Sequence, residues 1–382
     1  MPGILDTTCD PRAGASRPEQ IPELTSIRGF AATWVVLFHF NKDILALFAE
    51  PAGIRRVLES GYLGVDLFFV LSGFVISYNY ADQFRTFRTR RYKAFLLARL
   101  ARIYPVHLVT LIAVLPMVAV ARRQHMPLDW QSYTLEQFIQ NVFLIHAWIP
   151  SFKWNWNYPS WSISVEWLLY LLFPAFALLV ARIRTPRTAI IATLLAVLLS
   201  VVTIRTTSEA SFRELYRGFT QFSSGCLLFR LSRLLPSSTT RWRSAILWAL
   251  CIGSVIAVQV PTIGPSLFVL TAPLIIASLV ILRGRDRILC SAPLLMAGEM
   301  SFSLYMTHTL VQRFVNRAIP AARFADLDPL GRVGILLLYA SLVAVAAILC
   351  FLLVEKPSRL ALRRRMARAP RDSRLDGAAA MF

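Results

Sequence analysis

The chain has 382 residues, of which 56% are hydrophobic and only 16% are charged, and its mean hydropathy is +0.55. Soluble domains carry about 25% charged residues, so this composition excludes an ordinary soluble protein and predicts an all-α polytopic membrane protein. The net charge of +20 would suit a nucleic-acid partner. The Lys and Arg residues fall at the ends of apolar runs, however, so we exclude nucleic acid and interpret the charge as a topology signal.

Residues 1–23 lack the basic-then-apolar pattern of a cleaved signal peptide, and we interpret them as a cytoplasmic tail. The five cysteines form no CxxC pair, so we expect packing roles and no metal site. The transmembrane domain is predicted over 24–356, followed by a basic cytoplasmic tail over 357–382. Ten apolar runs are long enough to span a bilayer: about 24–45, 61–80, 94–119, 161–181, 188–204, 213–230, 244–260, 264–282, 293–316 and 332–354.

The turns between these runs alternate in charge. Arg-rich turns occur at 83–93, 182–187, 230–243 and 283–287, whereas the intervening turns carry few basic residues. With ten spans, every Arg-rich turn lies on the same side of the membrane. The positive-inside rule makes that side cytoplasmic and places both termini there.

The first run, "LTSIRGFAATWVVLFHF" (24–40), contains two ionisable residues, Arg28 and His39. Eleven steps of about 100° leave the two side chains within about 20° of each other, on one helical face and about 16 Å apart along the axis. If Arg28 lies near the cytoplasmic surface, His39 lies deep in the membrane, where an ionisable group suggests function. A neutral imidazole there can act as a base or a nucleophile; snorkelling of Arg28 and helix pinning by His39 are the structural alternatives.

Three further runs contribute charged residues at matching depths. Asp66 and Glu166 lie near the predicted level of His39, where a carboxylate could orient the imidazole. Arg99 and Arg102, three residues apart on one face, lie near the cytoplasmic surface with Arg28. This basic cluster is suited to phosphate groups, although inward-facing topology arginines would show the same pattern.

The connection over residues 120–160 breaks the alternation of spans and turns. Its "TLEQFIQNVFLIHAW" segment is helical in period but short for a span, so we expect a re-entrant or interfacial helix followed by a Trp-rich loop. That loop is either a membrane anchor or an acceptor platform. His107 and His146 are interpreted as structural histidines, while the role of His308, in the middle of the ninth run, stays open.

Five segments together resemble the acyltransferase 3 family of integral membrane acyltransferases. They are "LTSIRGFAATWVVLFHF", with Arg and His separated by ten residues, "GYLGVDLFFVLSGFVIS", "RLARIYPVH", "WSISVEWLLYLLFP" and "SFSLYMTH". The resemblance runs from about residue 24 to 356. In "WSISVEW", Trp167 stands where many relatives have a second acidic residue, which weakens any role that needs two carboxylates.

The resemblance implies a ten-helix bundle that moves an acyl group, often acetyl, from cytoplasmic acyl-CoA to a hydroxyl of a glycan or glycolipid acceptor. It also implies a catalytic role for His39 and donor contacts through Arg28, Arg99 and Arg102. Combined with the reasoning on the residues, this gives a mechanism in which Asp66 or Glu166 orients His39. His39 is then either the base of a direct transfer or the carrier of the acyl group. We expect acyl-CoA as a co-substrate, no permanently bound cofactor, contact with membrane lipid, and a multi-pass protein of a cell membrane, the bacterial inner membrane in particular.

A multi-span transporter or flippase is the competing class, because it too carries charged residues within its spans. It predicts repeat symmetry and paired broken helices, which the sequence does not display. A sensor or scaffold without chemistry leaves the common depth of His39, Asp66 and Glu166 unexplained.

Overall fold

The fold, seen in a computed structural model, is all-helical. The structure describes residues 21–47, 52–126, 129–149, 156–206, 210–235, 243–257, 259–260, 264–282, 286–320, 324 and 327–368. Helix makes up 86% of it, and the described residues contain no strand. Most of the two predicted tails, 1–23 and 357–382, lies outside the described residues, which begin at residue 21 and end at residue 368.

Fourteen α-helices are described, together with shorter helical turns. The helices are α1 (Pro22–His39), α2 (Asn41–Leu47), α3 (Ala52–Glu59), α4 (Gly64–Tyr80), α5 (Thr89–Arg123), α6 (Leu135–Val142), α7 (Ser160–Ala181), α8 (Pro186–Thr206), α9 (Ala210–Leu234), α10 (Arg243–Ala257), α11 (Gly264–Leu282), α12 (Ala292–Ala318), α13 (Pro329–Cys350) and α14 (Lys356–Arg368). The 3₁₀ turns are η1 (Gly61–Leu63), η2 (Ala81–Phe84) and η3 (Trp130–Ser132), and the π-helical turn η5 (Phe351–Glu355) joins α13 to α14.

Five helical segments of the described chain are long and apolar enough to cross a membrane: Ile54–Phe84, Thr89–Arg123, Ser160–Ala181, Pro186–Thr203 and Pro329–Leu362. A sixth span results if α1 and α2, which meet at a bend of 65°, count as one broken span. Helices α9 and α12 have 25 and 27 residues, but they carry several charged side chains. The five or six apolar segments establish the membrane character of the chain, while the count of ten spans stays a prediction.

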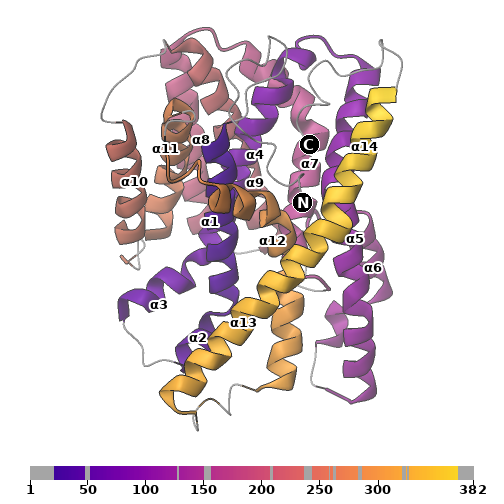
Figure 1. Ribbon diagram of the computed structural model, residues 1–382. Coiled ribbons are helices and arrows are strands. Elements are labelled where there is room, and N and C mark those ends of the chain that lie inside the picture. Colours follow the sequence, from indigo (N-terminus) through magenta and orange to yellow (C-terminus); the bar gives the residue numbers. More distant parts are fainter. Residues whose placement is uncertain are drawn as a thin grey trace.

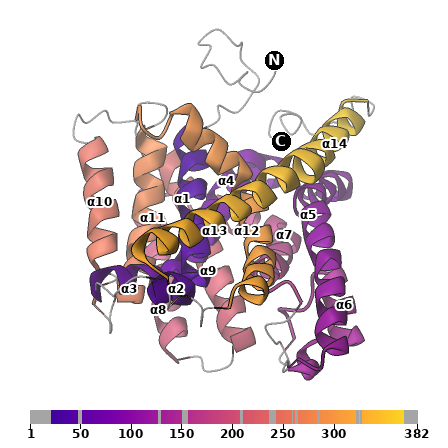
Figure 2. The same ribbon diagram turned by 60° about the horizontal axis from the view of Figure 1, so that its bottom comes forward.

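The helices pack around a central group formed by α1, α4, α9 and α12. The most extensive contacts are between α1 and α12 and between α4 and α9. Figure 1 shows α10 and α11 at one edge of the bundle and α5 and α6 at the opposite edge. In Figure 2, α13 and α14 form one long rod that crosses α12 and reaches α5. These packed helices bring side chains distant in sequence to common cavities.

Glycines allow the two central helix pairs to approach closely. A Cβ atom on Gly298 of α12 would overlap the backbone carbonyl of Thr25 on α1, and a Cβ on Gly225 of α9 would overlap that of Val70 on α4. Small residues at such crossings permit backbone contact between membrane helices. The positions of α1 and α12 relative to each other are thus fixed by packing at Gly298.

The connection over 120–160 is less helical than predicted. Between the end of α5 at Arg123 and the start of α7 at Ser160, the described residues form only α6, with eight residues, and the turn η3. Thr134 caps α6, since its hydroxyl oxygen accepts a hydrogen bond from the Gln137 amide at 3.3 Å. Residues 150–155, part of the Trp-rich stretch, lie outside the described residues.

Candidate active site

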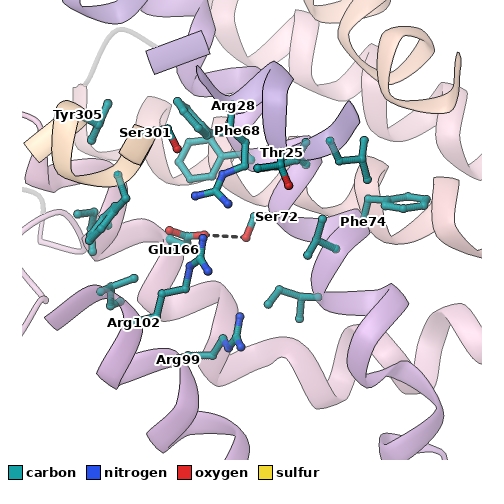
Figure 3. Close-up of a pocket in the computed structure, with 18 of the residues that line it drawn as sticks. Thr25, Arg28, Phe68, Ser72, Phe74, Arg99, Arg102, Glu166, Ser301 and Tyr305 are labelled. Atoms are coloured by element: carbon teal, nitrogen blue, oxygen red, sulfur yellow. Dashed lines mark hydrogen bonds between the residues drawn. The ribbon is translucent and has the colours of Figure 1, made fainter. Parts of the chain in front are cut away.

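A cavity of about 230 Å³ gathers the arginines that the sequence singled out. Arg28 enters it from α1, Arg99 and Arg102 from α5, and Arg359 from α14. We call it the arginine cavity. In Figure 3 the Arg28 and Arg102 side chains reach toward the hydrogen bond between Glu166 and Ser72 from opposite sides. The structure thus brings together the three arginines predicted as donor contacts.

The arginines of this cavity differ in their partners. Arg359 Nη1 lies 3.1 Å from Glu299 Oε2 and 3.4 Å from Glu355 Oε1. Arg99 Nη2 donates to the Tyr80 hydroxyl at 2.9 Å. Within the described chain, the Arg28 and Arg102 guanidiniums form neither a hydrogen bond nor an ion pair, although both line the cavity. Two forked cations without a fixed counterion form a suitable site for phosphate oxygens.

Glu166 lies in the arginine cavity rather than beside His39. Its Oε1 atom accepts hydrogen bonds from the Ser72 hydroxyl at 2.7 Å and from the Tyr170 hydroxyl at 2.5 Å. The expectation that Glu166 orients His39 therefore does not match the fold, because the side chain faces the cavity with the arginines. Glu299 and Glu355 act most strongly on the charge of Arg28, and Glu166 adds a smaller effect.

A second cavity, of about 390 Å³, contains His39 and is here called the histidine cavity. Its wall combines aromatic and charged side chains: Phe38, Tyr62, Tyr158, Trp161, Arg213, Glu214 and Arg217. His39 Nδ1 lies 2.9 Å from the Val35 carbonyl oxygen, and Nε2 has no hydrogen-bond partner in the described structure. Because a carbonyl oxygen only accepts, Nδ1 carries the hydrogen of the neutral imidazole, and Nε2 keeps its lone pair.

Asp66 is paired with Arg217, which corrects the interpretation of its role. Arg217 Nε and Nη2 donate to the two carboxylate oxygens of Asp66 at 2.7 and 2.5 Å, and Nη1 donates to Glu214 Oε2 at 3.0 Å. The exposed fractions of the Arg217 and Asp66 side chains are 7% and 0%. Both oxygens of Asp66 are thus bound to a guanidinium on α9, so the carboxylate is not the group that orients His39.

Val65 and Tyr305 line both cavities and therefore form the wall between them. The Tyr305 hydroxyl is fixed by Ser162 Oγ at 2.8 Å and donates to the Pro159 carbonyl at 3.1 Å.

Two other histidines have local structural contacts. His107 Nε2 lies 2.9 Å from the Asn141 carbonyl oxygen, and His146 Nε2 lies 3.2 Å from Ser160 Oγ. Their rings are stacked, with centroids 6.4 Å apart. Neither lines the arginine or the histidine cavity, in keeping with the structural interpretation from the sequence.

The sequence reasoning missed Arg217 and Arg359. Arg359 was placed in the predicted tail, and Arg217 was counted only as part of an apolar run. Each has an acidic residue at helical spacing: Glu214 precedes Arg217 by three residues, and Glu355 precedes Arg359 by four. That spacing was the available signal, because such pairs share one helical face.

Comparison with known proteins identifies the family of this chain. The model of the acyltransferase 3 family, described as an acyltransferase domain, matches residues 21–355. "Acyltransferase MdmB" of Streptomyces mycarofaciens is 26% identical over 390 residues, which cover 93% of this chain and 96% of that protein. No solved structure matches. With the family model covering most of its length, the chain belongs to the acyltransferase 3 family and is a membrane acyltransferase.

Proposed function

We propose that this chain transfers an acyl group, acetyl in the first instance, from acyl-CoA to a hydroxyl group of a glycan or glycosylated acceptor. In the proposed topology, ten spans cross a cell membrane, the bacterial inner membrane, and both termini are cytoplasmic. The arginine cavity then opens toward cytoplasmic acyl-CoA, and the histidine cavity receives the acceptor.

One observation carries this proposal: a single helix, α1, presents Arg28 to one cavity and His39 to the adjoining one. Their axial separation of about 16 Å is comparable with the reach of a pantetheine arm. Phosphates bound by Arg28, Arg99 and Arg102 would leave the thioester near the wall formed by Val65 and Tyr305. A long, thin donor with an anionic end suits two cavities that share this wall.

The geometry of His39 supports direct transfer with His39 as general base. With the hydrogen on Nδ1, the Nε2 lone pair accepts the proton of the acceptor hydroxyl. The hydroxyl oxygen forms a bond to the thioester carbonyl carbon, the C–S bond breaks, and the sulfur leaves as CoA thiolate. The proton held by Nε2 then neutralises the thiolate, which restores the starting form of His39.

Glu166 and Asp66 have supporting roles in this proposal. Glu166, bonded to Ser72 and Tyr170, moderates the repulsion between Arg28 and Arg102 when no phosphate is bound. Asp66 holds Arg217 against the histidine cavity. Membrane lipid surrounds the apolar faces of the bundle, and acyl-CoA is a consumed donor rather than a resident cofactor.

The experiment is CoA release from acetyl-CoA by the purified protein in lipid nanodiscs, with a panel of neutral and acidic glycans as acceptors. Wild-type protein is expected to release CoA in an acceptor-dependent way, and His39→Ala is expected to abolish this. His125→Ala is the matched control, because His125 is exposed and lies outside both cavities. Near-normal release by His39→Ala would remove His39 from the chemistry.

Donor binding is tested separately with Arg28→Gln and Arg102→Gln. Each removes one charge-assisted contact, of about 1.5–3 kcal/mol, so the Kd for acetyl-CoA is expected to rise about 10- to 100-fold. If wild type neither binds acetyl-CoA nor releases CoA with any acceptor, the proposal fails and transport is the class to test.

A further inference from the structure

His308 of α12 contacts His39 directly. Its Nε2 atom lies 3.2 Å from His39 Nδ1, and the two ring centroids are 4.7 Å apart. The His308 side chain is fully buried. Direct transfer by His39 alone, as proposed above, does not use this residue.

The packing of α1 against α12 explains why His39 and His308 lie side by side. Gly29 of α1 packs against Gly298 of α12, since a Cβ atom on Gly29 would lie 3.0 Å from the Gly298 nitrogen. His39 follows Gly29 by ten residues, and His308 follows Gly298 by ten. Two parallel helices that start in contact at the glycines thus meet again at the histidines, about 15 Å further along.

The contacts of His39 Nδ1 decide the direction of the hydrogen bond between the rings. If His308 donated to His39, Nδ1 would need a lone pair, and that lone pair would face the Val35 carbonyl oxygen at 2.9 Å. Two acceptors at that distance repel each other. The hydrogen therefore lies on His39 Nδ1, shared between Val35 and His308, and His308 Nε2 accepts.

The remaining nitrogen of His308 then carries its own hydrogen. His308 Nδ1 has no hydrogen-bond partner in the described structure, and the backbone of Tyr305 and Leu304, about one turn earlier on α12, acts on the His308 imidazole. A backbone carbonyl accepts from an N–H group, so these neighbours favour the tautomer that leaves Nε2 free to accept. The two rings form a directed chain from His308 to the reactive nitrogen of His39.

We infer that His308 is the positioning residue for His39, taking the place that the sequence suggested for Asp66 or Glu166. This inference rests on the proposed function of His39 as base. When Nε2 takes the proton of the acceptor hydroxyl, His39 becomes an imidazolium with two N–H groups. The Nδ1–H group then donates to a neutral acceptor, His308 Nε2, which stabilises the positive charge and fixes the ring plane.

The first test observes the tautomers directly and does not depend on acyl transfer. The chain has five histidines, so ¹⁵N-histidine NMR of the protein in nanodiscs gives few signals, each assigned by substitution. At neutral pH the His39 signal is expected to show protonated Nδ1 and unprotonated Nε2. A wild-type signal with the hydrogen on Nε2 overturns the inference.

Two substitutions separate positioning from packing. His308→Phe keeps a ring but removes one of the two acceptors of His39 Nδ1–H, while the Val35 carbonyl still fixes the tautomer. The NMR shift of the His39 Nδ1–H group is therefore expected to change, and the rate of CoA release is expected to fall at least tenfold. His308→Gln places an amide oxygen near the position of Nε2 and is expected to restore both the Nδ1–H shift and most of the rate. His107→Phe, at a buried histidine outside the pair, is the control and should leave the His39 signals unchanged.

The positioning role of His308 and the proposed acyl transfer would be refuted by different results. If His308→Phe leaves the His39 Nδ1–H shift and the pH profile of CoA release as in wild type, His308 is not a positioning residue even though transfer stands. If the Nδ1–H shift changes as expected but no variant, wild type included, releases CoA with any acceptor, the pairing of the rings stands and the proposed function fails.

Discussion

Replacing Asp66 with asparagine is expected to loosen the contact between α4 and α9. The change removes the negative charge that binds Arg217 through two hydrogen bonds, in surroundings where both side chains are buried. Breaking a buried ion pair costs about 3–5 kcal/mol, because the remaining charge is left without compensation. Glu214 still binds Arg217 Nη1, so we expect the lower end, about 3 kcal/mol, or about 150-fold in the opening equilibrium.

Cys226 provides the assay for this opening. It lies on α9, is 1% exposed, and its thiol faces the Gly73 carbonyl of α4 at 3.6 Å. A thiol reagent reaches it only when the two helices separate, so its labelling rate follows the local opening equilibrium. Asp66→Asn is expected to raise the labelling rate of the Cys226 peptide, measured by mass spectrometry, by about two orders of magnitude.

Two controls define the result. Asp82→Asn breaks an exposed ion pair with Arg85 and should change the labelling by less than about threefold. Asp66→Leu combined with Arg217→Met removes both charges and should recover much of the protection. If Asp66→Asn keeps wild-type protection of Cys226 but abolishes acyl transfer, Asp66 acts in the chemistry and its assignment to Arg217 is refuted.

Four further predictions concern the cavities and their supports. Arg359→Gln is expected to raise the KM for acetyl-CoA about tenfold with kcat retained, since it removes a charge at the arginine cavity; an unchanged KM would exclude Arg359 from donor binding. Tyr305→Leu opens the wall between the cavities, so the ratio of butyryl-CoA to acetyl-CoA turnover should rise about tenfold. Gly298→Leu forces α1 and α12 apart and should abolish transfer, whereas full activity would contradict the packing at this glycine. Burial lowers the pKa of His146 to about 3, so between about pH 6.5 and 3 the unfolded chain binds a proton that the folded chain does not. The stability of the fold should therefore decrease as the pH falls through this range. His146→Gln should flatten this pH dependence, measured by thermal unfolding at several pH values.

Helical periodicity was sufficient to predict which residues of one helix share a face. Arg28 and His39 were expected on one face of a helix, and the structure has both on α1, at two adjoining cavities. Arg99 and Arg102 likewise share the face of α5 that lines the arginine cavity, as Arg28 does from α1. The regular geometry of a helix fixes such relations without knowledge of the fold.

Depth in the membrane was a poor guide to contacts between helices. Asp66 and Glu166 were predicted beside His39 because they lie at a similar level, but depth leaves the rotation of each helix about its axis undetermined. Asp66 turns toward Arg217 on α9, and Glu166 turns toward Ser72 on α4. Pairing of opposite charges explains Asp66, since a buried carboxylate beside a guanidinium is far less costly than one beside a neutral imidazole.

The partner of His39 did leave a trace in the sequence, in a spacing shared by two segments. "GFAATWVVLFH" ends ten residues after Gly29, and "GEMSFSLYMTH" ends ten residues after Gly298. Glycine at a crossing lets two helix backbones touch, and an equal spacing from that crossing to a second residue brings the second residues together if the helices run parallel. Parallel packing of α1 and α12 is a property of the whole fold, because the helices lie more than 250 residues apart. The equal spacing therefore does not predict the pair by itself. It does so together with the parallel direction of α1 and α12, and the two observations together assign His308 to His39.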